Sequence, residues 1–190
     1  HSSPKRRVEI AIIGAGFGGL GLGARLAQRG QRNFRIFDKA NGPGGTWWVN
    51  RYPGCACDVP SHLYSLSFAP NPDWTRRFAP RAEIQHYLQR LTDRFDLAGH
   101  LELGCGIEQA AWNAGEQVWD LQDSQGRGWR ADMLVSAMGG LSRPDLPDIK
   151  GLEDFTGPAF HSQQWDDSVG LAGKRVAVIG TGASAAQFVP

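Results

Sequence analysis

The stretch Val8–Gly19, VEIAIIGAGFGG, decides the fold of this chain. Its first half is rich in β-branched residues, which is typical of a buried parallel strand. The strand runs directly into Gly14-Ala15-Gly16-Phe17-Gly18-Gly19, whose G-x-G-x-x-G spacing is that of a dinucleotide-binding turn. Apolar helix formers follow as far as Gly30, a residue suited to the left-handed stop of a helix. The stretch therefore predicts a strand, a phosphate-binding turn and a helix.

Each glycine of the turn has a physical task. Gly14 permits the tight bend, Gly16 lets a pyrophosphate approach the backbone, and Gly19 lets the helix pack closely on the strand. The helix then offers unpaired N–H groups and the positive end of its dipole to the phosphates. The residues assigned to this first nucleotide site are Gly14, Gly16, Phe17, Gly18 and Gly19.

Asp38 follows a second predicted strand, Phe34–Phe37, and lies nineteen residues after Gly19. Rossmann folds place at that spacing the carboxylate that binds a ribose hydroxyl. We include Asp38 and the adjacent Lys39 in the first nucleotide site. A Rossmann-like fold without a nucleotide is the alternative, and the motif does not distinguish one dinucleotide from another.

The composition is that of a globular protein. The chain has 190 residues, 41% of them hydrophobic, and a formal net charge of +1. This charge gives no reason to expect nucleic acid or a membrane as partner, and Lys5-Arg6-Arg7 is interpreted as a solvated terminus. No apolar run could span a bilayer and no signal peptide is recognisable, so we predict a cytoplasmic protein. His1-Ser2-Ser3 is set aside as a remnant foreign to the fold.

No metal is expected. The three cysteines have no metal-ligand spacing, and their odd number argues against a disulfide framework, so we interpret them as reduced thiols. His86 and His100 have no Cys or His partner at ligand spacing and are given no role. The cysteines are Cys55, Cys57 and Cys105.

The segment Asn41–Asp58 combines many Gly and Pro residues, which predict irregular structure, with two Trp and a Tyr. A loop this long and this aromatic usually lines a site. Gly44 and Gly45 would then let the backbone approach a flavin, with Asp58 at its reactive face. Two structural alternatives remain open: Trp48 can plug the side of the sheet, and Asp58 can cap a following helix or turn.

This loop resembles the active-site loop of type I Baeyer-Villiger monooxygenases, which are class B flavoprotein monooxygenases. Gly44–Asp58 fits the pattern [AG]-G-x-W-x-x-x-x-[FY]-P-[GM]-x-x-x-D at every fixed position. The resemblance implies that Gly45, Thr46, Trp47 and Tyr64 lie near the isoalloxazine of FAD. It also implies that Asp58 is the active-site carboxylate, paired with a catalytic Arg beyond Pro190.

A second pattern of the same family lies in a Pro- and Gly-rich connection. Phe155–Asp166 fits the Baeyer-Villiger fingerprint F-x-G-x-x-x-H-x-x-x-W-[PD], whereas N- and S-oxygenating flavin monooxygenases generally carry another aromatic in place of Trp. The resemblance gives His161 a part in domain positioning and NADPH handling, although a loop histidine with satisfied hydrogen bonds is the simpler interpretation. The fingerprint residues are Phe155, Gly157, His161, Trp165 and Asp166.

Near the end of the chain the opening pattern repeats. Arg175–Ile179 predicts a strand, and the G-x-G-x-x-A turn that follows begins a second nucleotide site. Two such turns fit an enzyme that holds FAD at the first and NADPH at the second. The residues assigned to the second site are Gly180, Gly182, Ala183 and Ser184.

The middle of the chain completes the predicted fold. A helix is predicted for Pro80–Asp96, then a short strand, a three-stranded meander, and a strand after Ala131 that returns to the main sheet. The meander strands are predicted at Glu108–Trp112, Gln117–Gln122 and Trp129–Arg130. At the end of the returning strand Gly139 would face the cofactor, although Ala137-Met138-Gly139 replaces the family's usual A-T-G.

The predicted class is α/β: a glutathione-reductase-like FAD-binding Rossmann domain with a β-meander insert, then the start of a second, NADPH-binding Rossmann domain. The expected boundaries are 1–140 for the FAD domain, 141–172 for the linker and 173–190 for the NADPH domain.

The resemblance implies an enzyme that uses FAD, NADPH and O2 to convert a ketone to an ester or lactone through a C4a-peroxyflavin. Alternatives are an N- or S-oxygenating flavin monooxygenase, a non-catalytic fragment of a flavin domain, and an NAD-linked dehydrogenase, for which the aromatic loop has no purpose. The choice between NADPH and NADH stays open.

Overall fold

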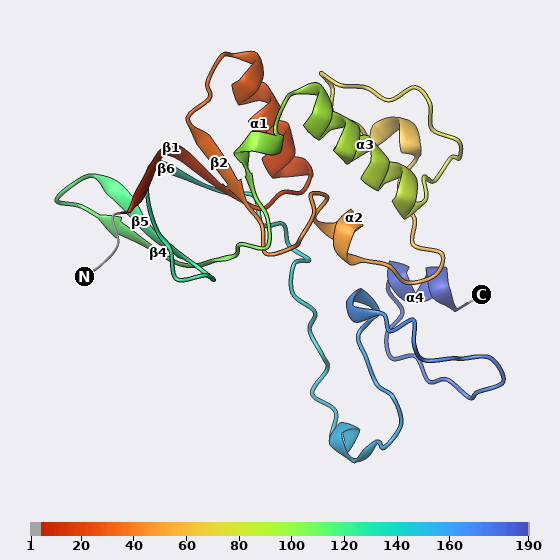
Figure 1. Ribbon diagram of the computed structural model, residues 1–190. Coiled ribbons are helices and arrows are strands. Elements are labelled where there is room, and N and C mark those ends of the chain that lie inside the picture. The colour runs from red at the N-terminus through yellow and green to blue at the C-terminus, as the bar shows by residue number, and fades with distance from the viewer. Residues whose placement is uncertain (1–4, 190) are drawn as a thin grey trace. The chain divides into compact units, whose positions relative to one another are not determined.

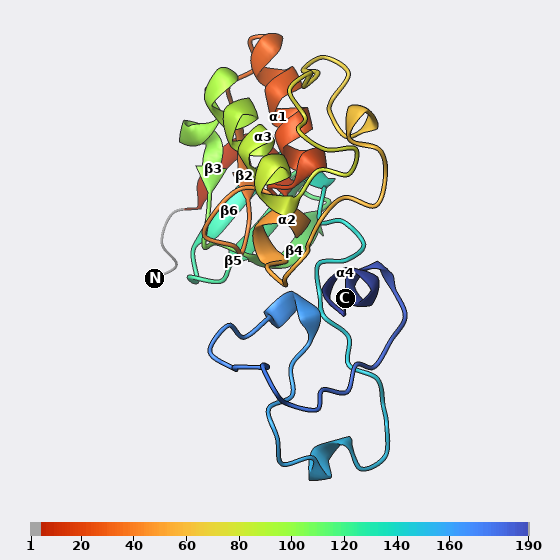
Figure 2. The same cartoon turned by 90° about the vertical axis from the view of Figure 1, so that its right-hand side faces the viewer.

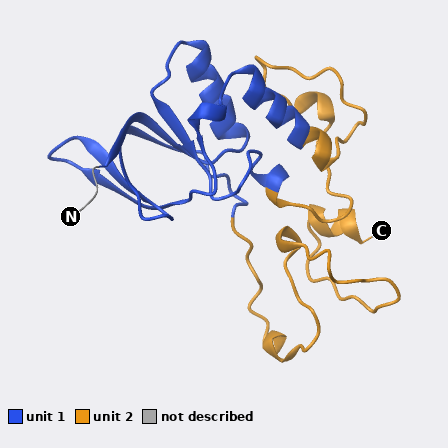
Figure 3. Ribbon diagram, viewed as in Figure 1, with its two compact units in different colours: residues 1–48, 85–142 blue, residues 49–84, 143–190 orange. Residues whose placement is uncertain are grey.

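The computed structural model describes residues 5–189, so that His1–Ser3 lie outside the described part (Figure 1). The chain divides into two compact units (Figure 3). Unit 1 comprises residues 1–48 and 85–142, and unit 2 comprises residues 49–84 and 143–190. Unit 1 contains the β-sheet, whereas unit 2 is built from loops, short 3₁₀ turns, one short α-helix and the first turn of a longer helix, Arg81–Arg94, whose remainder belongs to unit 1.

The opening stretch folds as predicted. The strand β1 (Arg6–Ile13) leads through the glycine turn into the helix α1 (Phe17–Gln28). β1 pairs in parallel with β2 (Phe34–Phe37), the second predicted strand. Gly30 follows α1 with φ of 77°, the left-handed conformation that ends a helix at little cost for glycine.

Six strands form one sheet in the order β3-β2-β1-β6-β5-β4. The four strands β3, β2, β1 and β6 are parallel, and β5 and β4 continue the sheet in antiparallel pairing. Because β1 lies between β2 and β6, the turn after β1 opens at the point where Rossmann folds bind their ligand. The remaining strands are β3 (Leu101–Glu102), β4 (Ile107–Asn113), β5 (Val118–Asp123) and β6 (Gly128–Ser136).

The predicted meander and the predicted returning strand are joined, which corrects the sequence analysis. We predicted separate strands at Trp129–Arg130 and after Ala131, but β6 is one continuous strand. One edge of β6 pairs with β5 and the other pairs with β1. A strand has hydrogen-bonding groups on both edges, so the meander extends the central sheet.

The two long helices of unit 1 lie side by side on one face of the sheet (Figures 1 and 2). The predicted helix at Pro80–Asp96 is α3 (Arg81–Arg94), and its part in unit 1 lies beside α1. The rings of Phe17 and Tyr87 stack between the two helices with centroids 5.9 Å apart. Apolar residues of α3 are buried, which confirms that its apolar stripe belongs to the core: Ile84, Tyr87, Leu88 and Leu91.

Two local predictions are wrong. The glycine-rich loop contains one helical turn, α2 (Thr46–Val49). Arg175–Ile179 is not a strand, and Val176 and Ile179 remain more than half exposed. A strand requires a neighbour for its backbone hydrogen bonds, and the described residues of unit 2 include no strand that could pair with this segment. The turn and helix after it do form, with φ of 117° at Gly180 and α4 at Ala183–Phe188.

Within residues 5–189, no helix is both long and apolar enough to cross a membrane. The same residues contain no group of three or more His, Cys, Asp and Glu side chains that could hold a metal ion. All three cysteines are buried free thiols.

Candidate functional site

Glycine residues close the turn after β1 because no side chain fits there. A Cβ on Gly14 would lie 2.4 Å from Ala137 O, and Gly14 has φ of 110°. A Cβ on Gly19 would lie 1.8 Å from Gly14 O. Gly14 N also donates to Phe37 O at 2.7 Å. The turn, the end of β2 and the end of β6 can therefore meet only with glycine at positions 14 and 19.

The loop after β2 is held against the same turn. A Cβ on Gly45 would lie 2.9 Å from Gly16 Cα, and Gly44 N donates to Ala15 O at 2.8 Å. Gly16 is the N-cap of α1 and has no side chain with which to cap the first turn. The result is a surface of glycine backbone at the positive end of α1, which suits a pyrophosphate.

Asp38 links this turn to the loop after β2. Its Oδ2 accepts a hydrogen bond from Ala15 N at 2.7 Å, and its Oδ1 accepts from Ala40 N at 2.8 Å. Cys105 N donates to the backbone oxygen of Asp38 at 2.8 Å. A carboxylate has about four lone-pair sites, so Asp38 can accept further hydrogen bonds from ribose hydroxyls while holding the loop.

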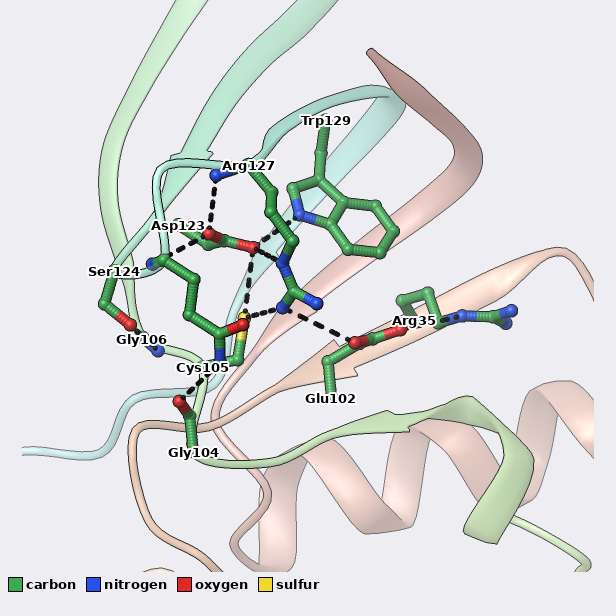
Figure 4. Close-up of polar contacts among 10 residues, drawn as sticks. Arg35, Glu102, Gly104, Cys105, Gly106, Asp123, Ser124, Arg127 and Trp129 are labelled. Carbon is green, nitrogen blue, oxygen red and sulfur yellow. Dashed lines mark hydrogen bonds and ion pairs between the residues drawn. The ribbon is translucent and has the colours of Figure 1, made fainter. Parts of the chain in front are cut away.

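A buried polar cluster in unit 1 centres on Asp123 (Figure 4). Its Oδ2 accepts from Trp129 Nε1 at 2.9 Å, from Arg127 Nε at 2.7 Å and from Cys105 Sγ at 3.3 Å. Burial alone would raise the pKa of this carboxyl, but the hydrogen bonds hold its pKa far below the usual range. Burial, followed by the hydrogen bond to Asp123, raises the pKa of the Cys105 thiol to about 11.

The cluster supports the Asp38 loop through the backbone. Gly104 N donates to Ala40 O at 2.8 Å, beside the bond from Cys105 N to Asp38. The turn between β5 and β6 holds this segment in place, because Gln125 Nε2 donates to Gly104 O at 3.3 Å. No sequence pattern predicts this support, because the residues that provide it are far apart in the chain.

The aromatic part of the loop begins in unit 1. Trp47 is buried, whereas Thr46 is exposed. A Cβ on Gly42 would lie 2.3 Å from the Trp48 ring, so this ring packs directly against the loop, which favours its structural interpretation. Gln85 Nε2 donates to Pro43 O at 2.7 Å, while the buried Gln85 Oε1 has no hydrogen-bond partner among the described residues.

Asp58 and Tyr64 lie in unit 2, where Asp58 is exposed and Tyr64 is half-buried. The backbone before Asp58 is fixed, since Cys57 N donates to Ala79 O at 2.8 Å. The 3₁₀ turn Ser61–Leu63 starts at Pro60 without a side-chain cap, so the capping alternative for Asp58 gains no support.

A cavity of about 310 Å³ adjoins this loop in unit 2. Burial raises the pKa of the Cys55 thiol and of the Tyr52 phenol, and lowers the pKa of Arg81. The thiol and the phenol therefore stay protonated at neutral pH. The residues that line the cavity include Tyr52, Cys55, Arg76, Phe78 and Arg81.

Comparisons with known proteins agree with this geometry. A model of NAD(P)-binding Rossmann-like domains matches residues 12–80, and a model of L-lysine 6-monooxygenase/L-ornithine 5-monooxygenase matches residues 72–189, more than half of the chain. A Baeyer-Villiger monooxygenase of Pseudomonas aeruginosa is 54% identical over 97% of the chain.

Solved structures give the same result. Cyclohexanone monooxygenase from Rhodococcus sp. Phi1 bound to NADP+ matches 98% of the chain with a TM-score of 0.88 and 39% identity. A complex of OTEMO with FAD and NADP matches 98% of the chain with a TM-score of 0.88 and 31% identity. The chain belongs to the Baeyer-Villiger monooxygenases, a family of class B flavoprotein monooxygenases. It spans 35% of the Pseudomonas relative, 36% of the Rhodococcus chain and 37% of OTEMO.

The fingerprint residues differ in their surroundings, from packed rings to an exposed phenylalanine. Trp165 packs against Phe160 with ring centroids 5.5 Å apart. His161 Nδ1 accepts from Gln163 N at 3.1 Å, a local contact of the kind that the simpler interpretation of this histidine expects. Asp166 Oδ1 accepts from Ser168 N at 2.9 Å, whereas Phe155 is 61% exposed.

The remaining predicted residues fall into two groups, one in each unit. Gly139 in unit 1 has φ of 70° and is exposed, and Lys39 Nζ donates to Ser142 O at 2.9 Å. In unit 2, Gly180, Gly182 and Ala183 are exposed and Ser184 is half-buried. The structure thus brings together Gly14, Gly16, Gly19, Asp38 and Gly45 in unit 1.

Proposed function

We propose that the whole protein is an FAD- and NADPH-dependent monooxygenase that inserts one oxygen atom of O2 next to a ketone carbonyl, giving an ester or a lactone. One observation carries this proposal. The loop that fits the Baeyer-Villiger pattern, beginning at Gly44, is held directly against the glycine turn at Gly16. We further propose that the protein is cytoplasmic, and that the domain boundaries are 1–140, 141–172 and 173–190.

FAD fits the first turn. The glycine backbone at Gly14–Gly19 and the first amides of α1 would hold its pyrophosphate, and Asp38 would accept the hydroxyls of its ribose. Gly45, Thr46 and Trp47 would then lie beside its ring system. The buried Gln85 Oε1, which has no partner among the described residues, is an acceptor that a bound ligand could satisfy.

Bound FAD supplies the oxygen-activating chemistry and NADPH, held at Gly180–Ser184, supplies the hydride. The residues of this chain bind and orient these groups. Asp58 would hold the positive charge of an Arg from the rest of the protein, which stabilises negative charge on the reacting oxygen. The buried Trp47 would keep water away from the ring system.

Hydroxylation of an amine nitrogen is a second candidate. The observation that favours it is the match of residues 72–189 to the L-lysine 6-monooxygenase/L-ornithine 5-monooxygenase model. Trp165-Asp166 in the fingerprint and the 54% identical relative favour the ketone reaction.

The test is to supply the full-length enzyme with FAD, NADPH and O2, and to present cyclic ketones, aryl ketones, sulfides, L-lysine and L-ornithine in parallel. We expect esters or lactones from ketones. Hydroxylation of the amino acids without ketone conversion would favour the second candidate, and oxidation of sulfides alone would favour an S-oxygenating enzyme. The 190-residue chain by itself should convert none of these substrates. Conversion by this chain alone would contradict its interpretation as a non-catalytic fragment of a flavin domain.

A further inference from the structure

Gln187, on the helix α4 of unit 2, is hydrogen-bonded to the loop that precedes Asp58. Its Oε1 accepts from Tyr52 Oη at 3.0 Å and from Ala56 N at 3.2 Å. Its Nε2 donates to Ala56 O at 2.9 Å. The side-chain amide thus satisfies both backbone groups of Ala56, as a neighbouring β-strand would.

Ring packing reinforces this contact. Tyr52 and Phe188 meet edge to face with centroids 5.8 Å apart, and Phe188 packs on the fingerprint residue Trp165 at 5.2 Å. A Cβ on Gly54 would lie 2.4 Å from Gln187 O, so the loop can approach α4 this closely only with glycine there. One end of α4 is therefore packed on both the fingerprint and the active-site loop.

The position of Gln187 connects two predicted sites. α4 starts at Ala183, directly after the Gly180–Gly182 turn, so a shift of this turn would move the helix and Gln187 with it. On the other side, Ala56 is two residues before Asp58. The charge of Asp58 also reaches Tyr52, as one of the smaller causes, after burial, of the raised pKa of that phenol.

We propose that Gln187 is a positioning residue that couples nucleotide binding at the Gly180–Gly182 turn to the placement of Asp58. This inference rests on the proposed function, because it takes the second turn as the NADPH site. When the dinucleotide settles on the turn, α4 and Gln187 hold the Tyr52–Ala56 backbone in one position, and Asp58 is presented in one geometry. Without the amide of Gln187, nucleotide still binds but the loop is no longer ordered by it.

The test compares the full-length wild type with Gln187→Leu, which keeps a good helix former, one atom shorter than glutamine, but removes the three hydrogen bonds. Gln164→Leu, at an exposed position of the same unit, is the matched control. Amide hydrogen exchange of residues 52–58 is measured with and without NADP+, and NADP+ affinity is measured separately by titration. These readouts do not depend on turnover.

We expect NADP+ to slow exchange of residues 52–58 about fivefold or more in the wild type and in the control, and to leave it unchanged in Gln187→Leu, with NADP+ still bound. Tyr52→Phe keeps the ring on Phe188 and removes one of the three hydrogen bonds of the Gln187 amide, so a smaller reduction of the NADP+-induced slowing is expected. If Gln187→Leu does not fold, the test rests on Tyr52→Phe. If NADP+ slows amide exchange of residues 52–58 as much in Tyr52→Phe as in the wild type, the proposal is overturned.

A second readout addresses catalysis. In Gln187→Leu the fraction of NADPH consumed as hydrogen peroxide should rise about fivefold or more, while the KM for NADPH changes less than the kcat for ketone oxygenation. Unchanged kcat and peroxide yield overturn the proposal. Binding of NADP+ without slower exchange in the wild type overturns the coupling alone, whereas absence of NADP+ binding in the wild type overturns the proposed function as well.

Discussion

The indole N–H of Trp129 donates to the carboxylate of Asp123 at 2.9 Å, and Asp123 is only 1% exposed. Arg127 forms a hydrogen-bonded ion pair with the same carboxylate, with 2.7 Å between Arg127 Nε and Asp123 Oδ2. A buried charge is tolerated only when partners satisfy it, and here they join the turn between β5 and β6 to β6 itself. The same turn holds the segment that fixes Asp38, so the cluster stabilises the fold close to the proposed ribose site.

Asp123→Asn should destabilise the protein strongly. The change keeps the shape of the side chain but removes the charge that Arg127 and Trp129 contact, and the expected loss in free energy of unfolding is about 3 kcal/mol. Asp132→Asn is the matched control, because Asp132 pairs with Arg7 at 2.7 Å at the surface, and its loss should be below about 1 kcal/mol. Urea unfolding followed by fluorescence measures both, and equal losses would contradict the prediction.

Asp123 should also make stability depend on pH. The pKa of Asp123 in the folded protein lies far below the value of about 3.9 in the unfolded chain. The carboxylate therefore makes its full contribution to the free energy of unfolding when the pH is above about 4. The contribution is lost as the pH falls below about 4, because the Asp123 carboxylate then binds a proton in the unfolded chain but not yet in the folded protein. Unfolding curves at several pH values should converge for wild type and Asp123→Asn at acid pH. A constant difference between them would refute this assignment.

Cys105 should resist alkylation in the folded protein. Burial raises the pKa of its thiol to about 11, so at pH 8 about one thiol in a thousand is ionised, and the side chain is fully buried. Iodoacetamide followed by mass spectrometry should label Cys105 in urea but not in buffer. Labelling in buffer at the rate of a free cysteine would show that the segment opens.

Structure that is set by neighbours in the chain could be predicted from the sequence. The stretch Val8–Gly19 and the left-handed Gly30 define a strand, a turn and a helix without distant partners. Arg175–Ile179 does not form the predicted strand, because a strand depends on a pairing neighbour that no local pattern reveals. The role of Gln187 could not be predicted either, since a glutamine within a helical run carries no sign that it contacts Ala56, more than a hundred residues away.

Met138 offers a test of the departure from the family's A-T-G pattern. Met138 is 53% exposed, so Met138→Thr removes no core packing. If the hydroxyl gives one hydrogen bond to the cofactor, affinity should rise by about 1 kcal/mol, or roughly fivefold. Titration of the full-length apoprotein with FAD measures the change, with Met138→Val as the control of similar shape. Equal affinity of the two variants would mean that this position does not contact the cofactor.

Alanine substitutions at Gly14 and Gly30 distinguish two effects on stability: that of a left-handed backbone and that of a side chain that blocks the turn. Both have positive φ, at 110° and 77°, but a Cβ on Gly14 meets Ala137 O at 2.4 Å whereas nothing lies within 4 Å of one on Gly30. Gly30→Ala should therefore lose only about 1 kcal/mol of stability and retain FAD. Gly14→Ala must push β6 away from the turn, so it should lose FAD binding and considerably more stability. FAD retained by Gly14→Ala at the wild-type level would show that the turn can open without harm, and would remove the steric basis for placing the cofactor there.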